Sequence, residues 1–114
     1  GEVVARRTLL SGGEESSMEI PGRGRFQATP DGRLFVFYHI HGQSAAGTPL
    51  SENRLTELLP DGTSTPAVTV AMKHPMAVFF TATPRGGSAP STTLDLLGAR
   101  AGTSQTISYA RVLL

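Results

Sequence analysis

The sequence predicts an all-β protein in which short strands are joined by tight turns. Its strongest signal is a run of aromatic and β-branched residues that alternate at period two over residues 33–41. Two Pro-Asp-Gly turns, at residues 30–32 and 60–62, favour hairpins, and 13 Gly and 8 Pro among 114 residues oppose long helices. A chain of this length with 39% hydrophobic residues can bury one modest core.

The strand predicted over residues 33–41 carries bulky apolar groups on both faces. Phe35 and Phe37 point one way, while Val36, Tyr38 and Ile40 point the other way. Both faces are therefore expected to be covered. Residues 25–29 are expected to form its hairpin partner through the first Pro-Asp-Gly turn.

The same reasoning predicts further strands along the chain. They fall at residues 3–10, 54–59, 67–72, 77–83, 93–97 and 106–113. A short helix over residues 51–59, with Ser51 as its N-cap, is the alternative for one of these segments. Loops are expected at residues 11–17, 43–51 and 85–91.

The two halves of the chain resemble each other. Residues 35–38 match residues 77–80 at an offset of 42, and residues 55–58 match residues 94–97 at an offset of 39. Gly62-Thr63-Ser64 recurs as Gly102-Thr103-Ser104 at an offset of 40. Repeats over residues 25–72 and 73–114 follow, each roughly the 40–50 residues of one β-propeller blade.

The segment RFQATPDGRLFVFYHIHG, followed by ENRLTELLPDGTSTP, resembles a blade of the BNR/sialidase-like β-propellers of carbohydrate-active proteins. The Asp-box is incomplete: Asp31 and Gly32 stand at altered spacing, and the chain has no Trp. The resemblance implies about two four-stranded propeller-like blades, in a portion of a larger β-propeller or in a ring of several copies. The alternative fold is a single β-sandwich of about seven strands, with residues 1–114 as one all-β domain.

Composition removes several classes of function. Without cysteine the chain forms no disulfide, thiolate metal site or cysteine nucleophile. A net charge of +1 gives no broad electrostatic footprint for nucleic acid or an anionic membrane, and no apolar run approaches the roughly 20 residues of a membrane span. Localisation stays open, with secretion or a bacterial periplasm as one expectation.

His39 and His41 are the most suggestive local pair, because alternate residues of a strand point the same way. The predicted ligand-binding residues lie at strand ends and in loops: His39, His41, Glu52, Arg54 and Arg85. A metal on the two histidines would need a third ligand such as His74 or Glu52. Neither a metal nor another cofactor is expected.

The leading functional prediction is a carbohydrate-binding or structural β-propeller-type module, acting as a homo-oligomer or with the remainder of a larger chain. One alternative is a portion of a polysaccharide lyase or glycoside hydrolase. A lyase would use Tyr38, His39 or Tyr109, and a hydrolase needs two carboxylates across one bond. The second alternative is a β-sandwich interaction or assembly protein. No catalytic residue is assigned, and whether the chain is an enzyme is left open.

Overall fold

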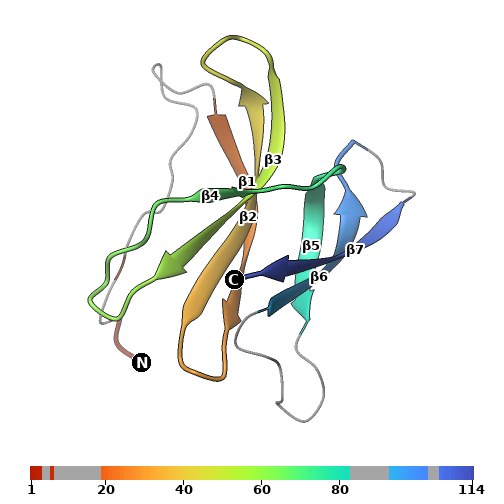
Figure 1. The fold of residues 1–114 in the computed structure, drawn as a ribbon. Coiled ribbons are helices and arrows are strands. Elements are labelled where there is room, and N and C mark those ends of the chain that lie inside the picture. The colour runs from red at the N-terminus through yellow and green to blue at the C-terminus, as the bar shows by residue number, and fades with distance from the viewer. Residues whose placement is uncertain (4–5, 7–18, 83–92, 103–105) are drawn as a thin grey trace.

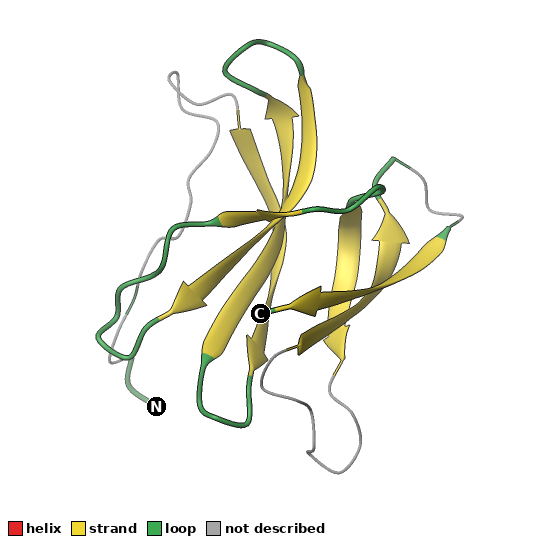
Figure 2. Ribbon diagram, viewed as in Figure 1, coloured by secondary structure: helices red, strands yellow, loops and turns green. Residues whose placement is uncertain are grey.

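The computed structural model describes residues 1–3, 6, 19–82, 93–102 and 106–114. These residues form two antiparallel β-sheets and no helix (Figure 2), which confirms the all-β prediction. None of them builds a helix long and apolar enough to cross a membrane. The strands are β1 (Glu19–Ala28), β2 (Leu34–Gln43), β3 (Pro49–Leu58), β4 (Val68–Val70), β5 (Met76–Ala82), β6 (Thr93–Arg100) and β7 (Ile107–Leu113).

The first four strands form one sheet in chain order, β1-β2-β3-β4. The predicted hairpin is confirmed: Phe26 of β1 lies opposite Val36 of β2, and the Pro-Asp-Gly turn joins the two strands. The second Pro-Asp-Gly turn closes with the Gly62 amide donating to the Leu59 carbonyl at 3.0 Å. This meander is possible because each turn is short enough to join neighbouring antiparallel strands.

The last three strands form a second sheet, also in chain order, β5-β6-β7. Figure 1 shows it beside the four-stranded sheet, linked by the segment that leaves β4 and enters β5. In this sheet Leu97 lies directly opposite Tyr109, and Ala99 lies opposite Ile107. Side chains on directly opposed residues project from the same face.

The hydrophobic core lies between the two sheets. Phe37 of β2 packs with Met76, Leu94 and Leu96 of the second sheet, and all four are at most 1% exposed. Partly buried apolar residues surround this cluster: Leu55, Val70, Met72, Ala110, Val112 and Leu114. The prediction that β2 is covered on both faces is confirmed, because Val36 and Ile40 on its other face are also buried.

A buried amide fastens the two sheets together. Asn53 of β3 is fully buried, and its side-chain nitrogen donates to the Met76 carbonyl at 2.8 Å. Its side-chain oxygen accepts from the Met76 amide, also at 2.8 Å. These two hydrogen bonds satisfy both the N–H and the C=O of Met76 at the start of β5, as pairing with a neighbouring strand would.

The observed strands differ from the predicted ones mainly at their ends. β1 begins at Glu19 rather than at residue 25, and β4 has three residues. Residues 51–59 lie in and just after β3, so the helical alternative is wrong, because β2 and β4 hold this segment in a ladder. The predicted loop over 43–51 is only partly right, since β3 begins at Pro49. The predicted strand 3–10 and the loops 11–17 and 85–91 lie wholly or mainly outside the described residues.

The segments matched within the sequence fall on corresponding strands. Residues 35–38 lie in β2 and residues 77–80 in β5, while residues 55–58 lie in β3 and residues 94–97 in β6. The glycines of the following turns, Gly62 and Gly102, have nearly equal positive φ angles of 85° and 83°. The described strands do not close a propeller, so the number of blades stays a prediction.

Candidate functional site

The two histidines predicted to bind a ligand lie together on β2. Their rings are stacked, with centroids 5.9 Å apart. His39 is buried, and its Nε2 lies 3.0 Å from the Ser51 hydroxyl, whereas His41 is exposed. Burial, and then the charge of His41, lower the pKa of His39. His39 is therefore a packed, hydrogen-bonded side chain, and His41 alone offers an open imidazole.

Glu52 and Arg54 lie on the opposite face of the same sheet. They stand opposite Ile40 and Tyr38 in the ladder, whereas His39 stands opposite Asn53. Arg54 donates to Glu52 at 2.7 Å and makes a paired contact of 2.9 Å with Glu19. The sheet thus separates the predicted residues onto two surfaces.

Arg85, the fifth predicted ligand residue, lies outside the described residues. Thr69, which the sequence analysis did not name, donates to Glu52 at 3.2 Å and belongs to the same network. Because the histidines lie on one face of the sheet and Glu52 and Arg54 lie on the other, no single pocket contains all four residues.

The carboxylates of the two sheets are occupied by arginines. Glu57 accepts two hydrogen bonds from Arg33, and Asp95 accepts two from Arg111. These bonds hold the pKa of each carboxyl below its ordinary value, so both are ionised at neutral pH. A general acid must carry a proton at working pH, which neither group does. The part of the chain that the structure describes also contains no group of three or more His, Asp or Glu that could hold a metal ion.

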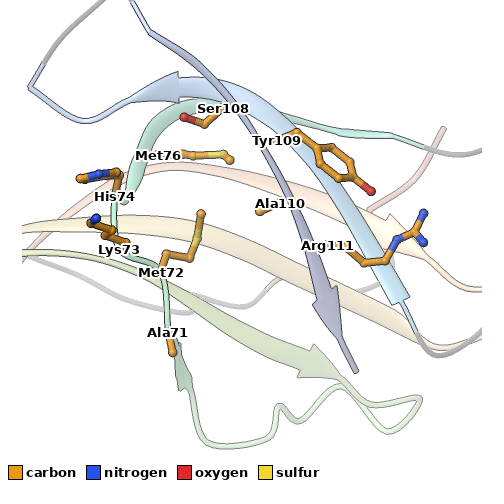
Figure 3. Close-up of a pocket in the computed structure, with 9 residues that line it drawn as sticks. All are labelled: Ala71, Met72, Lys73, His74, Met76, Ser108, Tyr109, Ala110 and Arg111. Atoms are coloured by element: carbon orange, nitrogen blue, oxygen red, sulfur yellow. The ribbon is translucent and has the colours of Figure 1, made fainter.

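A pocket of about 350 Å³ lies between β7 and the segment that connects β4 to β5 (Figure 3). Met72 and Met76 reach toward Ala110 in this view, and Lys73 and His74 lie at one end. Tyr109 and Arg111 extend away, toward the face on which both contact Asp95. The lining residues are Ala71, Met72, Lys73, His74, Met76, Ser108, Tyr109, Ala110 and Arg111.

The outward side of the three-stranded sheet is a second feature that the sequence analysis missed. Five apolar residues on it are 39–79% exposed: Val78, Leu97, Ile107, Tyr109 and Leu113. The register places them on one face, because Val78 and Ile107 flank Ala99 while Tyr109 stands opposite Leu97. We call these five residues the outer apolar face. Val78, Leu97, Ile107 and Tyr109 are neighbours in this register, and the Asp95–Arg111 pair separates Leu113 from them. Exposed apolar surface of this kind is a candidate interaction site.

A signal for this face exists in the sequence of β7, where Ile107, Tyr109, Arg111 and Leu113 alternate with smaller or more buried residues. The alternation does not show which side of β7 is exposed, because that depends on which side of this sheet packs against the four-stranded sheet. Comparison of the chain with models of known protein families, with curated proteins and with solved structures found no match.

Proposed function

We propose that this chain is a non-catalytic structural and assembly module whose outer apolar face packs against another β-sheet. The observation that carries the proposal is the exposure of five large apolar side chains on one face of a three-stranded sheet. Soluble monomers rarely leave such a surface in water, since burying it gains about 25 cal/mol for each Å².

The occupant of this face is a second copy of the chain. The outward face of the other sheet carries the network of Arg54, Glu19 and Glu52, which would lose hydration under an apolar partner. The two outward faces therefore do not complement each other. The outer apolar face can pack against itself through Val78, Leu97, Ile107 and Tyr109, with the exposed Asp95–Arg111 pair left at the edge of the contact. A two-fold arrangement of identical faces is also the commonest symmetry of soluble oligomers.

The predicted ring of propeller-like blades remains a rival form of the same assembly. It is supported by the two successive meanders and by the matching turns at Gly62 and Gly102. Three copies of two sheets would make a six-bladed ring. Such a ring would place the outer apolar face against the ion-paired face of a neighbour, and this is the reason that we prefer the two-fold dimer.

Sedimentation velocity across a range of concentrations tests the proposal. If two copies pair reversibly through this face, the average mass should rise from one chain toward two chains with concentration. The substitutions Leu97→Lys and Ile107→Lys should hold the protein as a monomer, while the control Val68→Lys should not. Val68 is suitable because it is 64% exposed and lies on the other sheet. A wild-type monomer at every concentration would refute the assembly proposal, and a mass of three chains would favour the ring.

Carbohydrate binding is the second candidate function. It is favoured by the Tyr109 ring, which is 62% exposed beside the polar groups of Asp95 and Arg111. An aromatic ring flanked by hydrogen-bonding groups can receive the apolar face of a sugar. Binding on a glycan array that disappears in Tyr109→Ala would support it, and an array without signal would exclude the sugars tested.

A further inference from the structure

We infer that the pocket between β7 and the segment from Ala71 to Met76 binds a small organic anion. Its carboxylate would lie at the end formed by Lys73 and His74, and its apolar body would contact Met72 and Ala110. The pocket volume of about 350 Å³ falls within the range of about 300–1,000 Å³ that is typical of small-molecule sites. This site lies on the side of β7 that bears Ser108 and Ala110, whereas the side chain of Tyr109, which also belongs to the lining, extends to the outer apolar face.

The charge of the pocket favours an anion. Arg111 belongs to the lining but is paired with Asp95, so its charge is already balanced on the other side of β7. Lys73 has no ion pair among the described residues, and neither does Arg100 at the end of β6. Partial desolvation, and then the charges of Arg100 and Lys73, lower the pKa of His74. Lys73 and Arg100, which have no carboxylate partner among the described residues, create a positive potential at this end.

The rest of the lining favours an apolar body. Ala71, Met72 and Ala110 supply accessible apolar surface, and a Met side chain such as that of Met72 adapts to irregular ligands. Ser108 adds one hydroxyl that can donate to a carboxylate oxygen. A bare inorganic anion would leave the methionine surface unused, whereas a neutral apolar molecule would leave Lys73 and His74 without a partner. A carboxylate with a short hydrocarbon chain satisfies both parts.

The occupied pocket should change the protonation of His74. The groups that face it are Lys73 on its own segment and Arg100 of β6, while Arg111 and Tyr109 of β7 turn toward Asp95. A bound carboxylate adds the missing negative charge, so the pKa of the imidazole should rise in the complex. Binding should accordingly tighten as the pH falls toward the ordinary pKa of histidine.

Titration of the full chain with hexanoate, followed by NMR of backbone amides and of the His74 imidazole, tests the inference. Hexanol serves as the neutral probe and inorganic phosphate as the bare anion. The expected result is that hexanoate shifts signals of residues 71–76 and 108–111, raises the pKa of His74, and binds at least about tenfold more tightly than either control probe.

Variants distinguish the contribution of the basic pocket residues from a general effect of net charge on hexanoate binding. Lys73→Gln and His74→Gln should each weaken hexanoate binding several-fold to about tenfold, since each removes a charge-assisted hydrogen bond. Arg23→Gln removes one positive charge, as Lys73→Gln does, but at an exposed residue of β1, and it should leave affinity unchanged. Equal affinity for hexanol, equal affinity for phosphate, or shifts confined to other residues would each overturn the inference. Unfolding curves of the variants confirm that the fold is retained.

Discussion

Replacing Asn53 by Ala should cost more stability than any other single polar substitution in the described sheets. The side chain is fully buried and meets both backbone groups of Met76 at 2.8 Å. Alanine would leave a buried N–H and a buried C=O without partners, at about 1–3 kcal/mol for each. We expect a loss of about 2–6 kcal/mol, which is a large part of the roughly 5–15 kcal/mol that stabilises a typical domain.

Urea unfolding followed by circular dichroism measures this loss. Gln43→Ala, at an exposed position of the neighbouring strand, is the matched control and should change the free energy of unfolding by less than about 0.5 kcal/mol. Asn53→Asp should be worse than Asn53→Ala at neutral pH, because a buried carboxylate would face the Met76 carbonyl and cannot donate to it. A loss below about 1 kcal/mol for Asn53→Ala would refute the claim that this amide fastens the two sheets.

Three further predictions concern the ion pairs, the turns and the histidines. Arg54→Met should lower the free energy of unfolding by about 1 kcal/mol at neutral pH. Hydrogen bonding to Arg54 lowers the pKa of Glu19, so this contribution to stability is present above about pH 4.5 and is lost as the pH falls through the lowered pKa. If the urea midpoints of the wild type and Arg54→Met still differ in strong acid, this explanation is contradicted. Gly62→Ala should lower the free energy of unfolding by about 1 kcal/mol in thermal unfolding, because the φ of 85° at Gly62 is unfavourable for alanine. Gly24→Ala should not destabilise the protein, because a Cβ there would meet only ordinary contacts of 3.5 Å or more. Equal losses for the two variants would contradict the backbone argument. The free energy of unfolding should fall as the pH drops below about 6.5, because the pKa values of His39 and His74 are lowered in the folded state and the unfolded chain therefore binds more protons. His39→Gln should reduce the slope of the free energy of unfolding against pH. An unchanged slope would show that His39 does not cause it.

The fold class was predictable from the sequence because local signals agreed with one another. Alternation over residues 33–41, two Pro-Asp-Gly turns and scattered prolines all favour short strands, and the structure places strands at those positions. The ends were less predictable. β1 extends back to Glu19 through Gly22 and Gly24, residues with low strand propensity, because its long partner β2 supplies a ladder. Pairing partners of this kind are invisible in a local pattern.

The candidate sites were harder to predict because they depend on how the two sheets pack. The sequence shows that His39 and His41 share a face, and the structure agrees. It cannot show that Glu52 falls on the opposite face, since that follows from the register between β2 and β3. The anion pocket joins residues 71–76 to residues 108–111, and the core contact between the sheets brings these distant segments together.

The central claim, that the outer apolar face meets the same face of a second copy, is tested most directly by the distance between spin labels. Because the chain has no cysteine, the substitution Ala99→Cys gives a single labelling position within this face, opposite Ile107. Pulsed electron paramagnetic resonance should then show one short distance between chains, and its amplitude should grow with concentration. The absence of any distance between chains at concentrations where sedimentation shows a dimer would contradict the claim.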